Sequence, residues 1–409
     1  MTRTSTTAEV GGIAERPAVE RVLQVHTRYR EPGGEERVVE AERRLLEGAG
    51  LSVRQVIFDN AELREARSLA GDLRIAGSAI WSRSAQRRVG ALVDAFGPQV
   101  VHVHNTFAVA SPSIYRAVGG TPVVQTLHNY RFVCPAATAF RDGHACTDCV
   151  GRPIPWPAVL HACVRGSRAQ SAVAATTLAL HRAVGTFEHG IAAYVALTSF
   201  QRQVMVDGGL PADRIRVIAN FHEPDPGVGR GPRDGVLYVG RLTAEKGLGP
   251  LIRAAAQQPR IVRVAGAGPL VDPVERSAAA GHIGYLGTLE ASAVLAELRG
   301  AVALVLPSVW FEGFPLVILE AYATGTPVIA SRIGSLAELV EDSVTGLLVR
   351  PDDEDELAER LRWAVDHPAE MAEMGARARQ RYETAYRAPA HLAALLDTYR
   401  ELVAAPSGP

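Results

Sequence analysis

The chain has 409 residues, of which 47% are hydrophobic and 21% are charged, and its formal net charge at pH 7 is −1. This length exceeds that of one typical hydrophobic core, so two domains are expected. A near-zero net charge provides no broad basic surface, which argues against a nucleic-acid-binding protein. The first residues lack the apolar run of a signal peptide, and no stretch of roughly 18 residues is apolar enough to span a membrane. We therefore expect a cytoplasmic protein.

Residues 1–19 show no hydrophobic periodicity and are rich in Thr, Gly and Glu, which is typical of a disordered leader. From residue 20, short runs rich in β-branched residues alternate with amphipathic helical patterns. This alternation indicates a parallel sheet covered by helices on both faces. We expect residues 20–198 to form one doubly wound, Rossmann-like domain. Its strands are predicted at 21–27, 53–59, 99–105, 121–129 and 192–198.

The second half repeats this pattern, so we expect a second doubly wound domain at 199–386. The boundary is expected near 199–235, which ends in a Pro/Gly-rich linker. A separate helix is predicted at 387–405, and one position that we consider for it is against the first domain. In such an α/β fold the two domains face a cleft, and ligands bind beyond the carboxyl ends of the strands. Strands of the second domain are predicted at 235–240, 260–266, 282–287, 301–308, 326–332 and 346–351.

Two loops at predicted strand ends carry residues suited to a diphosphate. Lys246 is the only lysine of the chain, against 42 arginines, and it follows Arg241 in the loop after 235–240. Gly266 and Gly268 follow the next strand, and glycine lets a backbone approach a phosphate closely. Arg and Lys supply the countercharge. The alternative is that the glycines serve a tight turn and that both cations are solvated surface charges.

Two glutamates border the next such loop. Glu312 follows the strand predicted at 301–308, and Glu320 lies about one turn into the following helix. Their apolar neighbours favour partnered carboxylates over the alternative of surface charges. The helix N-terminus between them offers backbone N–H groups to an anion. It comprises Gly313, Phe314, Pro315, Leu316 and Val317.

Together these motifs resemble the retaining glycosyltransferases of the GT-B fold, family 4. The resemblance rests on GRLTAEKG at 240–247, VAGAGP at 264–269, the Glu-x7-Glu spacing of Glu312 and Glu320, and TGLLVRPDD at 345–353. It implies transfer of a sugar from a UDP- or GDP-sugar to a hydroxyl of an acceptor in cell-envelope glycan, glycolipid or natural-product biosynthesis. The first domain would then hold the acceptor and the second the nucleotide sugar.

The resemblance also implies roles for individual residues. Arg241 and Lys246 would bind the diphosphate and neutralise the leaving group. Glu320 would bind the ribose hydroxyls, and Glu312, with the backbone of Gly313 and Phe314, would hold the donor sugar.

In the first domain, Gly33 and Gly34 correspond to the glycine-rich loop of the family, and His128 to its histidine beside the donor sugar. The alternative for His128 is a satisfied core imidazole, which is also our interpretation of His102 and His104.

With the leaving-group charge met by Arg241, Lys246 and a helix N-terminus, we expect catalysis without a metal cofactor and by a front-face departure. In a glycosidase-like alternative, Glu312 and Glu320 would act as nucleophile and acid. Two other classes remain open: another nucleotide-sugar enzyme such as an epimerase, and a non-catalytic sugar-nucleotide-binding protein.

All four cysteines fall within 134–163, a segment that the family motifs do not explain: Cys134, Cys146, Cys149 and Cys163. In a cytoplasmic chain a C-x2-C pair indicates a metal more often than a disulfide. We expect a structural zinc site with four thiolates. The alternative is a set of ordinary buried cysteines.

A helix predicted at 81–96 carries Trp81, Ala85, Val89, Leu92 and Phe96 on one face and arginines elsewhere. Such a helix is suited to peripheral contact with the inner face of a membrane, where it would meet a lipid-linked acceptor. The alternative, which we prefer, is a helix that packs on its own sheet.

Overall fold

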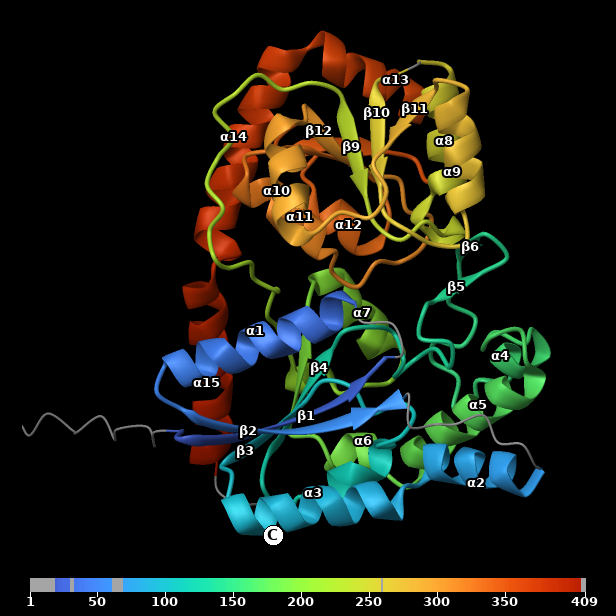
Figure 1. Cartoon of the computed structure of the whole chain (residues 1–409). Coiled ribbons are helices and arrows are strands. Elements are labelled where there is room, and N and C mark those ends of the chain that lie inside the picture. Colours follow the sequence, from blue (N-terminus) through green and yellow to red (C-terminus); the bar gives the residue numbers. More distant parts are fainter. Residues whose placement is uncertain (1–18, 30–32, 61–68, 259, 406–409) are drawn as a thin grey trace, which may run out of the picture.

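The computed structural model describes residues 19–29, 33–60, 69–258 and 260–405, with the side chains of 69–72 excepted. The leader predicted at 1–19 lies outside these residues, apart from Val19. The chain forms two α/β domains, each built on a six-stranded parallel sheet (Figure 1). The predicted fold class is confirmed.

The first sheet has the strand order β2-β1-β3-β4-β7-β8. Its central strands are buried over their whole length, because helices cover both faces. The strands are β1 (Arg21–Arg28), β2 (Ser52–Asp59), β3 (Val100–Val103), β4 (Val123–Leu127), β7 (Ala193–Ala196) and β8 (Ile215–Val217). The helices are α1 (Gly34–Gly48), α2 (Leu69–Ile80), α3 (Arg83–Phe96), α4 (Trp156–Leu160), α5 (Arg168–Ala183), α6 (Thr186–His189) and α7 (Ser199–Asp207).

The first domain is longer than the sequence predicts. Strand β8 pairs in parallel with β7, with Tyr194 opposite Ile215, so the domain extends at least to Val217 and does not end at 198. Strand β8 was missed because it has three residues, two of which are exposed at the edge of the sheet. Its apolar signal is therefore weak.

The second sheet has the order β11-β10-β9-β12-β13-β14. This order places β9 beside β12, so the loops that follow these two strands are neighbours. The strands are β9 (Val236–Val239), β10 (Val262–Ala265), β11 (Ile283–Tyr285), β12 (Ala303–Leu306), β13 (Val328–Ser331) and β14 (Gly346–Val349). The helices are α8 (Leu248–Ala256), α9 (Val271–Ala279), α10 (Ala291–Gly300), α11 (Leu316–Ala323), α12 (Gly334–Leu339), α13 (Glu354–Asp366) and α14 (Pro368–Ala385).

The final helix, α15 (Ala388–Ala404), packs on the first domain, beside α1 and β3 (Figure 1). Leu395 and Tyr399 are buried in a hydrophobic cluster with Val22 and Val100 of the first sheet. The last helix of the chain therefore completes the core of the first domain.

Helix α3 packs on its own sheet, with Ala85, Val89 and Val93 buried. The expectation that Trp81 belongs to this helical face is wrong. Ser82 is the N-cap of α3, so Trp81 precedes the helix, and its ring stacks on His181 at a centroid distance of 5.3 Å. In the described part of the chain, no helix is long and apolar enough to cross a membrane.

Candidate functional site

The two domains meet where β4 and β12 end. A Cβ atom built on Gly313 would lie only 2.7 Å from the carbonyl oxygen of His128, so a glycine is required for this close approach. The hydroxyl of Tyr130 donates to the carbonyl oxygen of Glu312 at 3.1 Å. The loop after β4 and the loop before α11 therefore form one interdomain contact, which carries His128 and Glu312.

Lys246 pairs with Glu312. Its Nζ lies 2.8 Å from both Oε1 and Oε2 of the carboxylate, and Ser308 Oγ donates to Oε1 at 2.7 Å. Glu312 is buried, and only 18% of the Lys246 side chain is exposed. Burial alone would raise the pKa of Glu312, but the charge and hydrogen bonds of Lys246 outweigh it and hold this pKa below its usual value. Glu312 is therefore a carboxylate at neutral pH.

The backbone around Lys246 is tightly packed. Gly247 has φ +71°, and a Cβ there would lie 1.7 Å from the carbonyl oxygen of Pro307 at the end of β12. Gly266 and Gly268 pack in the same way against the 240–242 loop. Their Cβ positions would lie 1.9 Å and 2.6 Å from the carbonyl oxygens of Gly240 and Leu242. Close backbone packing therefore explains why these positions are glycine. Their contact with a phosphate stays a prediction.

Arg241 lies on this loop with 61% of its side chain exposed, and its nearest acidic partner is Glu245 at 3.5 Å. An exposed ion pair of this length stabilises the fold little. The guanidinium can therefore turn toward a ligand at low cost.

Two helix N-termini face each other across the domain contact. No side chain caps α11, which starts after Pro315, and its free N–H end favours negative charge. Helix α1 starts at Gly34, whose Cα is so close to Leu316 that a Cβ would lie 3.3 Å from the leucine Cδ1. Gly33 donates its N–H to Glu36 at 2.7 Å. The structure thus brings the Gly33–Gly34 loop to the segment 313–317. In that segment Phe314 is buried, whereas Leu316 and Val317 are half-buried.

Glu320 pairs with a residue that sequence analysis missed. Arg37, on α1, places its Nη1 3.0 Å from Oε1 of Glu320, which is buried. Arg37 itself is 57% exposed. It lies about one turn beyond Gly34, and that position beside a predicted glycine-rich loop could have indicated it.

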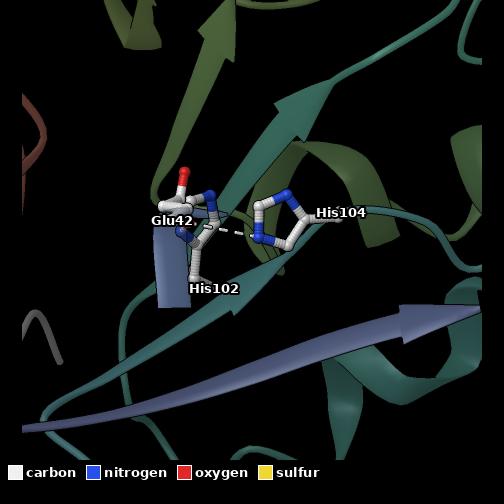
Figure 2. Close-up of side chains that lie close together, drawn as sticks. All are labelled: Glu42, His102 and His104. Atoms are coloured by element: carbon white, nitrogen blue, oxygen red, sulfur yellow. Dashed lines mark ion pairs between the residues drawn. The ribbon is translucent and has the colours of Figure 1, made fainter. Parts of the chain in front are cut away.

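His128 belongs to a buried polar cluster that links it to α1. Its Nε2 lies 3.0 Å from Nδ1 of His104, and Nε2 of His104 lies 3.3 Å from Oε1 of Glu42. The second contact is close but poorly aligned for a hydrogen bond, so it is mainly electrostatic. Figure 2 shows Glu42 of α1 reaching His102 and His104, at the end of β3.

This cluster fixes the protonation of His128. Burial would raise the pKa of Glu42, but the neighbouring His102 and His104 hold this pKa well below its usual value. Burial lowers the pKa of His104 from 6.5 to about 4 and that of His128 well below 6.5. The neutral tautomer of His104 that carries its proton on Nε2 places this N–H beside the Glu42 carboxylate and leaves Nδ1 to accept from Nε2–H of His128. His128 then keeps an unprotonated Nδ1, which can accept from a hydroxyl.

Glu42, His102 and His104 are the described residues whose possible metal-ligand atoms all lie within 4.8 Å of one another. Most of their polar atoms already have hydrogen-bond partners in the protein, although Nε2 of His104 has none. Thr126 and Tyr399 each lie 2.7 Å from a ring nitrogen of His102, and Gln24 donates to Glu42 at 3.0 Å. A polar core held by these internal hydrogen bonds explains this group without a metal. Glu42 interrupts the apolar face of α1 formed by Val38, Val39 and Leu46, a signal that could have revealed it.

Two family models match the chain. One, described as Glycosyltransferase Family 4, matches residues 32–225, and the other, described as Glycosyl transferases group 1, matches residues 229–381. The boundary between the two matches falls between β8 and β9, where the two sheets of the structure separate.

Curated relatives are most similar over part of the chain. A glycogen synthase of Mycobacterium tuberculosis is 38% identical over 168 residues, which cover 38% of this chain and 40% of that protein. The chain thus aligns with less than half of the length of that relative. A D-inositol 3-phosphate glycosyltransferase of Catenulispora acidiphila is 29% identical over 299 residues, or 69% of this chain and 67% of that protein.

Solved structures share the fold over almost the whole chain. A sucrose-phosphate synthase from Thermosynechococcus elongatus has a TM-score of 0.69 at 19% identity, covering 95% of this chain and 100% of that one. Anabaena HepE in complex with UDP and glucose has a TM-score of 0.64 at 18% identity, covering 93% and 100%. Both halves of the chain match glycosyltransferase family models, in the order and with the two-domain GT-B architecture of these structures, and this agreement supports a GT-B glycosyltransferase.

Proposed function

We propose that this protein transfers a sugar, with retention of anomeric configuration, from a UDP- or GDP-sugar to a hydroxyl acceptor. The observation that carries the proposal is the buried Lys246–Glu312 pair, which lies at the domain contact that also holds His128. The similar Anabaena structures hold UDP and UDP-glucose, which supports a nucleotide-sugar donor.

In this proposal the second domain binds the diphosphate. Lys246 and Arg241 supply its countercharge, and the uncapped N-terminus of α11 adds N–H donors. These groups stabilise the negative charge that develops on the leaving group, so no catalytic metal is required. Glu320 binds the ribose hydroxyls, and Arg37 then turns from Glu320 toward the phosphates or the solvent.

The environment of Glu312 favours the binding role over the glycosidase-like alternative. Both of its oxygens accept from Lys246, Oε1 also accepts from Ser308, and its pKa is lowered. The glycosidase-like alternative makes Glu312 the nucleophile, which needs a free carboxylate oxygen, whereas both of its oxygens already accept from Lys246. We therefore propose that Glu312 holds a hydroxyl of the donor sugar and that departure proceeds on the front face, with His128 accepting from another hydroxyl.

The acceptor is proposed to belong to cell-envelope glycan, glycolipid or natural-product biosynthesis. A membrane-bound acceptor is supported by a surface other than the one predicted at 81–96. Ile154, Trp156 and Leu160 are at least half exposed, and the guanidinium carbon of Arg152 lies 5.4 Å from the centre of the Trp156 ring. Apolar and cationic side chains together favour an anionic membrane surface.

Vesicle sedimentation tests this surface. The wild-type protein is expected to sediment with anionic vesicles and the Ile154→Ser/Leu160→Ser variant to remain in the supernatant. Equal sedimentation of the two proteins would remove this part of the proposal.

The activity is tested by incubating the protein with UDP- and GDP-sugars and measuring the released nucleotide by chromatography. Release of UDP or GDP, lost in Lys246→Ala, is expected. The anomeric configuration of the product, read by NMR, tests retention. An intact nucleotide sugar with altered sugar configuration would identify an epimerase. Tight donor binding without release, with any acceptor, would identify a binding protein.

A further inference from the structure

All four cysteines of the chain line one small cavity in the first domain, together with Arg141 and Asp148. The four thiols are free and none forms a disulfide. The cavity has a volume of ≈ 10 Å³, which is about the room that one atom-sized occupant needs. Four soft ligands thus surround a space for a single ion.

The cysteines come from three separate pieces of backbone. Cys134 lies in the turn after Tyr130, Cys146 and Cys149 follow a hairpin, and Cys163 follows α4. The hairpin, formed by β5 (Phe140–Arg141) and β6 (His144–Ala145), was not predicted from the sequence. The N–H of Cys146 donates to Ala139 at 2.7 Å, and that of Cys163 donates to Ala158 at 3.0 Å. The backbone therefore holds the thiols around the cavity.

The backbone between the cysteines is strained. Ala137 and Ala139 have φ +67° and +46°, and Ala162, directly before Cys163, has φ +51°. Alanine rarely adopts the left-handed region, and such residues persist where surrounding structure fixes them. Val133 and Ala139 pack in the core of the first domain, and a metal cross-link would add to this packing in holding the turns and the short hairpin.

We propose that Cys134, Cys146, Cys149 and Cys163 bind one Zn²⁺ as a structural tetrathiolate site. Zinc prefers four sulfur ligands in a tetrahedral arrangement, at Zn–S distances of about 2.3 Å. Binding converts four thiols to thiolates and releases four protons. Arg131 lies near Cys134 and Arg141 near Cys163, where they offset the negative charge of the site. The sulfurs are not among the groups within 4.8 Å of one another, so the ion draws them together.

The site connects to the interdomain contact through Tyr130. The N–H of Cys134 donates to Tyr130 at 2.8 Å, the N–H of Tyr130 donates to Ala137 at 3.1 Å, and the Tyr130 hydroxyl holds Glu312. Zinc therefore orders the turn that positions Glu312. This consequence rests on the proposed function, whereas metal binding does not.

The test uses the purified full chain and a metal readout that is independent of activity. Mass spectrometry of the acid-digested protein is expected to find about one equivalent of zinc. Replacement by Co²⁺ is expected to give the visible absorption of a tetrahedral tetrathiolate. Cys146→Ser/Cys149→Ser should lose the metal. Glu42→Gln, which alters the other potential ligand group, should retain it.

Three outcomes would overturn the inference. The first is a folded, metal-free protein whose four thiols all react rapidly with a thiol reagent. The second is iron with acid-labile sulfide, which identifies an iron–sulfur cluster. The third is a metal content that falls in Glu42→Gln and not in the cysteine variant. If the cysteine variant does not fold, the metal content and cobalt spectrum of the wild type still decide.

Discussion

Lys246 and Glu312 form a two-pronged ion pair, with the lysine Nζ 2.8 Å from each carboxylate oxygen. They are 66 residues apart in the sequence and come together because β9 and β12 are adjacent in the sheet. The only lysine of the chain therefore has a partner before any donor binds. A diphosphate must share this ammonium with Glu312, which couples binding of the leaving group to the carboxylate proposed to hold the sugar.

Lys246→Ala is expected to reduce kcat by about 10²–10³, because it removes a charge that acts mainly on the departing diphosphate. The donor KM should change less. Lys246→Arg should also be impaired, since a planar fork does not fit a point-charge position packed against Gly247 and Pro307. Steady-state kinetics with the identified donor measure both effects. Unchanged turnover in Lys246→Ala would exclude this role.

The ion pair also predicts a stability effect. Lys246→Met leaves a buried carboxylate without its cation, which costs about 3–5 kcal/mol when a buried pair is broken. Adding Glu312→Gln removes the stranded charge, so the double variant should unfold at a higher temperature than Lys246→Met alone. Thermal unfolding followed by circular dichroism gives the comparison. If the two substitutions lower the unfolding temperature additively, the two side chains do not interact in solution.

Glu320→Gln and Glu312→Gln should affect different kinetic constants. Gln at 320 keeps an acceptor oxygen for the ribose, so mainly the donor KM should rise, whereas Gln at 312 perturbs the reacting sugar and should lower kcat. Azide should rescue neither variant. Formation of a glycosyl azide in either one would establish the glycosidase-like alternative.

Glu42→Gln should lower kcat although Glu42 is separated from His128 by His104. When the His104 proton lies on Nε2, beside the carboxylate, His128 donates to His104 and keeps an unprotonated Nδ1. A loss of tenfold or more with little change in donor KM is expected. A matched control is Glu40→Gln on the same helix, whose carboxylate pairs with Arg43 on the surface. Similar losses in both variants would indicate a general effect on α1.

The buried cluster predicts that stability falls as the solution becomes acidic. The pKa of His104 is lowered to about 4 from 6.5, so between these values the unfolded chain binds a proton that the folded chain excludes. Stability is complete above pH 6.5 and should decline below it by roughly 1.4 kcal/mol per pH unit for each such histidine. His128 acts in the same direction. Thermal melts from pH 7.5 to 4.5 test this, and His104→Gln should flatten the slope.

The sequence predicted the individual strands better than the contacts between residues of different elements. All eleven apolar runs form strands, because buried parallel strands leave an unbroken signal. Strand β8 and the β5–β6 hairpin were missed, since short edge elements bury little. Pairings such as Arg37 with Glu320 depend on how two domains dock, and local periodicity contains no information on that. Glu42 was also missed, although the sequence shows it as a charged residue on the apolar face of a helix.

Helix α15 has a consequence for the order of folding during synthesis. Tyr399 and Leu395 fill the core of the first domain, and Tyr399 together with His391 completes the contacts of His102 and Glu42. A ribosome therefore finishes the entire second domain before it supplies the helix that closes the first. During synthesis the first domain therefore lacks part of its apolar core and of its buried polar cluster until α15 is made. The second domain is complete before the first, although it follows the first in the sequence.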